Sequence, residues 1–303
     1  MSQKPNMLLG AAAVVVTAAA SAAVVSQPPV AAATKATIVV VTAPAQTAAV
    51  ALAATSPAVK AAAPAVTASV TTPLAVPATL KPLDLSDMAL WNWNGRWMAS
   101  EWANANAPLP WKYDHITQVK RADTIFRLDA TGAPQLQALN GTVANANGLW
   151  EADVTLPKLK DGLIVAPLWL YDPASADEID FEFAGRYGLD LTLHAKRNGV
   201  MQKSSVRLFA GVDMSNQRKR FGIKVDQTAG FVEMYLDNRL VHRWNRNAMA
   251  FFISKPLKPW IEMWPATPTN SGFVQWAGKW PGLAKGETLS MTVHGYGYSP
   301  LVK

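Results

Sequence analysis

Acidic and apolar side chains alternate strictly in the segment 178-EIDFEF-183. Successive side chains of a β-strand point to opposite faces of its sheet. A strand over this segment therefore places Glu178, Asp180 and Glu182 on one face and three apolar side chains on the other. Because alternation of period two is typical of a strand with one buried face, the segment predicts a sheet that carries three neighbouring carboxylates.

A second alternating segment follows over Leu189–His194, and the residues between the two segments, Gly185–Gly188, are typical of a hairpin turn. The apolar faces of the two strands must match, which fixes the parity of their register. We predict a hydrogen-bonding role for the histidine of this strand; the alternative is a solvated or structurally bonded histidine. The simplest register gives three cross-strand pairs: His194 with Glu178, Thr192 with Asp180, and Asp190 with Glu182.

Short alternating segments recur from about residue 83 onward, separated by turn residues such as Asp237-Asn238. No amphipathic helix longer than two turns is expected. Residues 83–303 therefore predict one all-β domain, a two-sheet antiparallel β-sandwich of the jelly-roll, concanavalin-like kind. Besides the two strands above, we expect strands at Leu149–Leu156, Phe221–Val225, Phe231–Leu236, Arg239–Trp244, Leu257–Trp264 and Thr288–His294.

Residues 1–80 differ in composition, because they are mostly Ala, Val, Thr and Pro and contain no acidic residue and none of the 12 Trp. Lys4 precedes an uncharged run, Met7–Val25, which is typical of a secretory signal peptide over residues 1–25. The alternative is an uncleaved membrane anchor, since the run nearly matches the span of a bilayer. Residues 26–82 are rich in proline and predict a disordered linker. Both alternatives imply a secreted, periplasmic or cell-envelope protein.

The rest of the chain is close to neutral. Three of the 28 basic residues and none of the 21 acidic residues precede Lys81, which leaves a net charge of +4. No nucleic-acid partner is expected, because such partners require dense stripes of Lys and Arg. The absence of cysteine excludes disulfides, thiolate zinc sites and cysteine nucleophiles. No metal site is predicted, since His115, His242 and His294 lack metal-ligand spacing.

Three carboxylates on one face repel one another, which raises the pKa of at least one of them. One ionised and one protonated carboxyl group suit glycoside hydrolysis, and retaining enzymes hold the two groups about 5–5.5 Å apart. The Cα atoms of Glu178 and Glu182 lie roughly 13 Å apart along a strand, and two long side chains leaning together over a concave sheet close that gap. The other interpretation is an amphipathic strand with a solvated acidic face.

The acidic segment and its surroundings resemble glycoside hydrolase family 16. The E-x-D-x-E form at Glu178–Glu182 is similar to the licheninase (endo-β-glucanase) and xyloglucan-transglycosylase branch of that family. The resemblance covers about 200 residues and implies the same jelly-roll fold. Other segments that resemble family motifs follow in the family's order: 148-GLWEADV-154, 221-FGI-223 with 235-YLDNRLV-241, 263-MWP-265, and 275-QWAG-278.

Roles for the three carboxylates follow from the resemblance. It implies that Glu178 is the nucleophile and that Glu182 is the general acid/base. Asp180 would lie between them, hydrogen-bonded to the nucleophile. The resemblance also implies that no cofactor is required. Family members often hold a structural calcium ion away from catalysis, and this sequence does not locate one.

Tryptophan is the second feature of the predicted cleft. Its large ring suits the apolar faces of sugars, and the resemblance implies that Trp169, Trp264 and Trp276 bind substrate. Licheninase-like relatives often have Asn two places before the tryptophan of the 263–264 segment, where this chain has Glu262.

Together these features predict an exported, retaining endo-β-glycosidase that acts as a monomer on internal bonds of a polysaccharide. The substrate would be a glucan with β-1,3-1,4 linkages or an acidic exopolysaccharide. A membrane is a partner only if residues 1–25 stay uncleaved. Two alternatives use the same scaffold: a transglycosylase, and a non-catalytic glycan-binding protein of the cell envelope.

Overall fold

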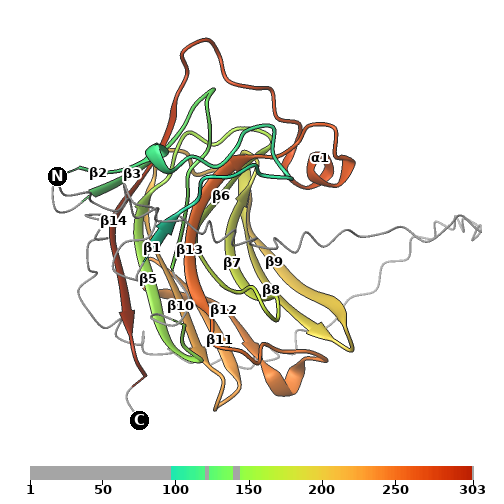
Figure 1. The fold of residues 1–303 in the computed structure, drawn as a ribbon. Coiled ribbons are helices and arrows are strands. Elements are labelled where there is room, and N and C mark those ends of the chain that lie inside the picture. Colours follow the sequence, from blue (N-terminus) through green and yellow to red (C-terminus); the bar gives the residue numbers. More distant parts are fainter. Residues whose placement is uncertain (1–96, 120–122, 139–143, 302–303) are drawn as a thin grey trace, which may run out of the picture. The chain divides into compact units, whose positions relative to one another are not determined.

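The computed structural model describes residues 97–119, 123–138 and 144–301 (Figure 1). The predicted signal peptide or anchor, the predicted linker and the first residues of the predicted domain lie outside these ranges. Within them, none of the helices has the length and apolar character needed to cross a membrane.

Two antiparallel sheets of seven strands each form the described part of the chain, which confirms the predicted sandwich. Three short helices accompany them: η2 (Tyr113–His115), η3 (Arg246–Ala248) and α1 (Ser271–Ala277). The first sheet runs in the order β1 (Trp97–Ala99), β4 (Gln135–Ala138), β13 (Lys258–Pro265), β6 (Leu163–Asp172), β7 (Asp177–Ala184), β8 (Tyr187–Arg197) and β9 (Val200–Asp213). The second runs β12 (Arg239–Asn245), β11 (Phe231–Leu236), β10 (Arg218–Asp226), β5 (Asn147–Thr155), β14 (Leu289–Ser299), β3 (Asp123–Leu128) and β2 (Ile116–Val119).

The core lies between the two sheets, whose strands form two curved layers (Figure 1). Ile179, Phe181 and Phe183 of β7 are fully buried. The two phenylalanine rings meet Phe221 of β10 edge-on, with ring centroids 5.2 and 6.1 Å apart. Burying one such side chain contributes about 1.5–3 kcal/mol. The apolar face of β7 therefore joins the two layers, and its acidic face points away from the core.

Strands β7 and β8 pair in the predicted register. Glu178 lies opposite His194, Asp180 opposite Thr192, and Glu182 opposite Asp190. The turn between the strands is shorter than predicted, because β8 already begins at Tyr187. Two residues connect the strands, and the first of them is a glycine with positive φ.

Position 185 requires glycine for two reasons, its backbone conformation and the closeness of its neighbours. Its φ is +80°, and an added Cβ would lie 2.1 Å from the carbonyl oxygen of Ala277. We expect Gly185→Ala to lower the free energy of unfolding by about 2–5 kcal/mol, because strained φ and steric overlap both contribute. Gly199 is the matched control, with φ +78° and nothing within 4 Å of an added Cβ. Gly199→Ala should cost only about 1–2 kcal/mol; equal losses in urea unfolding would contradict the steric argument.

The predicted hairpin near residue 237 is also confirmed. Strands β11 and β12 pair antiparallel. Asp237 and Asn238 connect them with φ of +49° and +66°, as a two-residue turn with both central residues at positive φ requires.

Candidate active site

Cross-strand pairs arrange polar and aromatic side chains in rows on the face of the first sheet that points away from the core. This arrangement brings together five of the predicted site residues. The rows are Tyr171–Glu178–His194–Lys203, Trp169–Asp180–Thr192–Ser205, and Glu182–Asp190–Arg207.

Asp180 is the most enclosed of the three carboxylates. It is only 1% exposed, and its Oδ2 atom has no hydrogen-bond partner. Burial and the charges of Glu178 and Glu182 raise its pKa well above the usual range. A hydrogen bond between Asp180 and Glu178 adds to this rise and lowers the pKa of Glu178. A neutral Asp180 that donates to Glu178 accounts for these shifts.

The two glutamates have different environments. The side chain of Glu178 is 27% exposed; burial raises its pKa to about 7, and the bond with Asp180 and the charge of Lys203 oppose that rise. Burial, with the charges of Glu178 and Glu262, raises the pKa of Glu182 to about 8. Between these values Glu178 is mostly ionised while Glu182 keeps its proton. The strand thus supplies one nucleophilic and one acidic group near neutral pH.

His194 lies against two of the carboxylates. Its Nε2 atom is 3.6 Å from Oε1 of Glu178 and 3.7 Å from Oδ2 of Asp180. Both separations are longer than a hydrogen bond, so its role as a hydrogen-bond partner stays a prediction. Burial and the positive charge of Lys203 lower the pKa of His194 to about 4, so the ring is neutral near pH 7.

Glu262 of β13 is a fourth carboxylate at this site, and the sequence did not predict a role for it. It accepts hydrogen bonds from Nε2 of Gln135 and from Nε1 of Trp264, the latter at 2.9 Å. Burial raises its pKa to about 7 despite these bonds, and its charge in turn raises the pKa of Glu182. Trp264 is only 8% exposed. The structure shows its hydrogen bond to Glu262, and its contact with substrate stays a prediction.

Three aromatic rings flank the carboxylates on the β6 side. Trp169 packs against Tyr171 and Trp260, with ring centroids 5.4 and 5.0 Å apart. The Nε1 atoms of Trp169 and Trp260 are buried without a hydrogen-bond partner. The sequence pattern gave no indication of Trp260, although this residue lies two positions before Glu262 on the same strand. This cluster is the aromatic surface that adjoins Asp180 and Glu178.

A further tryptophan reaches the site from outside the sheets. Trp276 belongs to α1, which begins after the capping residue Asn270. Its Nε1 atom donates a hydrogen bond of 2.7 Å to Oδ2 of Asp190, and Nζ of Lys203 lies 5.8 Å from the centre of its ring. The predicted site residue Trp276 is therefore bonded to β8, the strand that pairs with β7 and its three carboxylates.

Among the described residues, one cluster of three side chains has the geometry to hold a cation. Ligand atoms of Glu178, Asp180 and His194 lie within 4.8 Å of one another. Two carboxylates and a neutral imidazole suit a divalent transition metal. Glu178 and Asp180 are also candidate catalytic residues, and His194 is the histidine predicted to form hydrogen bonds at this site.

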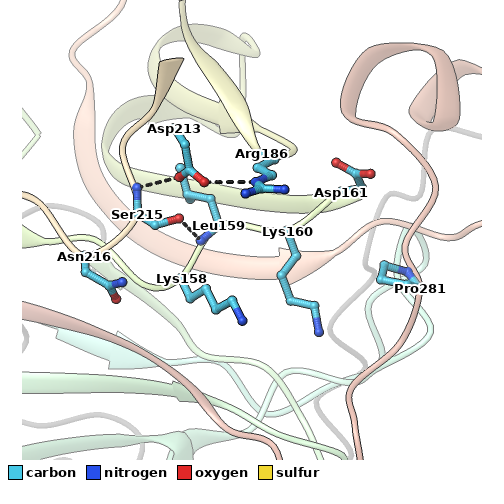
Figure 2. A pocket seen from close by; sticks show the side chains of 9 residues that line it. All are labelled: Lys158, Leu159, Lys160, Asp161, Arg186, Asp213, Ser215, Asn216 and Pro281. Atoms are coloured by element: carbon cyan, nitrogen blue, oxygen red, sulfur yellow. Dashed lines mark hydrogen bonds and ion pairs between the residues drawn. The ribbon is translucent and has the colours of Figure 1, made fainter. Parts of the chain in front are cut away.

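A pocket of about 450 Å³ lies beyond the turn that joins β7 and β8, at residues apart from the carboxylate rows (Figure 2). Two of its charges are paired, since Arg186 donates to Asp213 at 2.9 Å. The backbone N–H of Ser215 also donates to Asp213, and that of Leu159 donates to the Ser215 hydroxyl. Figure 2 shows these bonds within the wall of the pocket, where they hold the loops together.

Comparisons with known proteins identify a family for this chain. Residues 95–282 match the sequence profile of the family described as glycosyl hydrolases family 16. A search of curated protein sequences found no match.

Similar solved structures share the fold at low sequence identity. A β-glucanase of Bacillus licheniformis is 16% identical with a TM-score of 0.54, covering 69% of this chain and 94% of that one. An endo-glucanase of Bacteroides ovatus is 12% identical with a TM-score of 0.53, over 68% and 95%. The laminarinase catalytic domain of Thermotoga maritima is 18% identical with a TM-score of 0.52, over 69% and 93%.

Proposed function

Since this chain belongs to glycosyl hydrolase family 16, we propose that it is an exported, retaining endo-β-glycosidase that hydrolyses internal bonds of a polysaccharide. The observation that supports this most directly is the row of three carboxylates on β7, in which Glu178 and Glu182 share a face with Asp180 between them. The unequal pKa values of the two glutamates fit a nucleophile and a general acid.

The proposed reaction has two steps. Glu182 gives its proton to the glycosidic oxygen while the carboxylate of Glu178 attacks the anomeric carbon, which releases one part of the chain and leaves a glycosyl ester on Glu178. Glu182, now ionised, takes a proton from water, and the hydroxide oxygen attacks the same carbon. The ester bond breaks, Glu178 regains its charge, and the product keeps the anomeric configuration of the substrate.

Electrostatic coupling between the glutamates supports the change of role. The charge of Glu178 is one reason for the raised pKa of Glu182. That charge disappears when the ester forms, so the pKa of Glu182 falls and the group becomes an effective base. Asp180 and Lys203 both favour the ionised form of Glu178, which supports its role as the nucleophile and later as a leaving group.

The aromatic residues support a carbohydrate substrate. Trp169, Trp260 and Tyr171 form one group of rings beside the carboxylates, and Trp276 lies on the other side, above β9. Rings on both sides of the reacting groups suit a chain of sugars rather than a single one. A β-glucan is the first candidate substrate, and an acidic exopolysaccharide is the second because Lys203 is exposed near the carboxylates.

The function is tested with a panel of neutral β-glucans and acidic exopolysaccharides. We expect new reducing ends on one class, an early fall in polymer length, and first-formed products of β configuration by proton NMR. Products of α configuration would contradict retention, and release of only mono- or disaccharides would contradict endo action. Products longer than the substrate would favour transfer, while glycan binding without release would favour a binding protein.

The pH dependence of kcat/KM gives a separate prediction. We expect a bell-shaped profile that rises near pH 7 as Glu178 ionises and falls near pH 8 as Glu182 loses its proton. Glu262→Gln removes a negative charge that raises the pKa of Glu182, so the alkaline limb should move to lower pH. Glu287→Gln, at an ion pair with Lys160, is the control. An alkaline limb that stays in place in Glu262→Gln would contradict this electrostatic role.

A further inference from the structure

Asp190 is a buried charge directly opposite the general acid. It is 7% exposed and pairs with Glu182 across β7 and β8. Arg207 of β9 donates two hydrogen bonds to it, from Nε to Oδ1 and from Nη2 to Oδ2, each of 2.7 Å. Such a bidentate pair fixes the orientation of a carboxylate as well as its charge.

The oriented carboxylate has one more partner, the indole of Trp276. Nε1 of Trp276 donates to Oδ2 of Asp190 at 2.7 Å, across 86 positions of sequence. The other ring contacts of Trp276 are looser, with Phe273 at 6.5 Å between centroids and Nζ of Lys203 at 5.8 Å. The bond to Asp190 is therefore the short polar contact that sets the angle of this ring.

The helix that carries Trp276 is anchored at its last residue, Ala277, which directly follows the tryptophan. The carbonyl oxygen of Ala277 approaches the turn glycine between β7 and β8 so closely that an added Cβ there would lie 2.1 Å from it. The helix itself has seven residues, so it supplies little stiffness of its own. The turn fixes where the helix lies, and Asp190 fixes where its indole points.

We propose that Asp190, clamped by Arg207, is a positioning residue that holds the indole of Trp276 as an aromatic wall beside Glu182. A sugar ring stacked on that wall has its glycosidic oxygen placed for proton transfer. The inference rests on the proposed function and adds a residue to it: Asp190 positions Trp276 and does not touch the reacting atoms. Its charge has a second, smaller effect, because it also raises the pKa of Glu182.

A double-mutant cycle tests the coupling between the two residues. Asp190→Ala and Trp276→Phe each remove the bond, and Trp276→Phe keeps an aromatic ring. Each variant loses one hydrogen bond to a charged group. We therefore expect each to lower kcat/KM by about 10- to 100-fold, mainly by raising KM. The double variant should be no worse than the poorer single variant. Asp190→Asn keeps an oxygen that accepts the hydrogen bond from the indole, so this variant should retain most of the wild-type kcat/KM.

The matched control is Asp153→Ala on the second sheet. Arg218 donates to Asp153 from Nε and Nη2, as Arg207 does to Asp190, at a pair on the outer face. Asp153→Ala should change thermal stability without changing KM. Losses that multiply in the double variant, or an equal rise in KM in the control, would overturn the positioning role.

A readout that needs no activity separates this inference from the proposed function. In protein labelled with 5-fluorotryptophan, the Trp276 resonance is the one absent from Trp276→Phe. We expect that resonance to shift and broaden in Asp190→Ala and to stay in place in Asp153→Ala. If the wild type cleaves no polysaccharide but this shift occurs, the function fails and the positioning stands; an unshifted resonance overturns the positioning whatever the activity.

Discussion

Glu178→Gln is expected to lower kcat/KM on the polysaccharide by at least about 10⁴-fold, the scale seen when a hydrolase loses its nucleophile. Glutamine has the shape of glutamate but no charge with which to attack the anomeric carbon, so the glycosyl ester cannot form. Reducing-end release measures the loss. A variant that keeps more than a hundredth of the activity would show that another group is the nucleophile.

The same substitution is expected to stabilise the protein above neutral pH. The folded-state pKa of Glu178 is about 7, above the value of about 4.3 for an unfolded chain. The folded state therefore binds the proton more tightly, and this group's contribution to stability is lost as pH rises from about 4.3 through 7. Glutamine does not titrate, so Glu178→Gln should melt at a higher temperature than wild type at pH 8.

Thermal unfolding at two pH values measures this effect. Each kcal/mol corresponds to about 2–4 °C for a domain of this size, and the gain should be smaller at pH 5, where Glu178 is protonated in the folded protein. Asp153→Asn on the outer sheet serves as control, because it breaks an ion pair with Arg218 and should lower the melting temperature. A Glu178→Gln variant that is less stable than wild type at pH 8 would contradict the raised pKa of Glu178 in the folded protein.

Glu182→Ala is expected to separate substrates by the quality of their leaving group. Loss of a general acid costs about 10²–10⁴-fold when the leaving oxygen needs a proton, so cleavage of the polysaccharide should fall by that factor. An aryl β-glycoside with an acidic phenol needs little protonation and should form the glycosyl ester at close to the wild-type rate.

Azide tests the second step of the same variant. Without Glu182 no base activates water, so the ester on Glu178 accumulates, and the space left by the side chain admits an anion. Azide should attack the anomeric carbon and give a β-glycosyl azide with faster turnover. Equal losses on both substrates, or an azide product of α configuration, would show that Glu182 is not the acid/base.

The central part of the site was predictable because its information is local. Alternation over Glu178–Phe183 and Leu189–His194 fixes which side chains face the core, and matching the two apolar faces fixes the register. The structure has the same three cross-strand pairs. The family motifs, which are also short and contiguous, led to the same fold and to the same three carboxylates.

The residues around this part were harder to predict, each for a physical reason. Every residue of β13 is buried, so the strand does not reveal which side Trp260 and Glu262 face. Strand β9 is an edge strand that is mostly exposed, and its exposure removes the contrast between faces on which the pattern depends. The bond from Trp276 to Asp190 links a loop-borne helix to the sheet across 86 positions, and no local pattern encodes it.

The groups proposed to cleave the bond and the groups proposed to contact sugar lie on different parts of this chain. The three candidate catalytic carboxylates lie on β7, tied to the core by the apolar side chains between them, whereas the rings and charges around them come from β6, β8, β9, β13 and α1. If these proposed roles hold, substitutions in the neighbouring strands can change which polysaccharide is accepted while the strand that carries the three carboxylates is inherited intact. That separation is one way in which a single scaffold diversifies among many glycans.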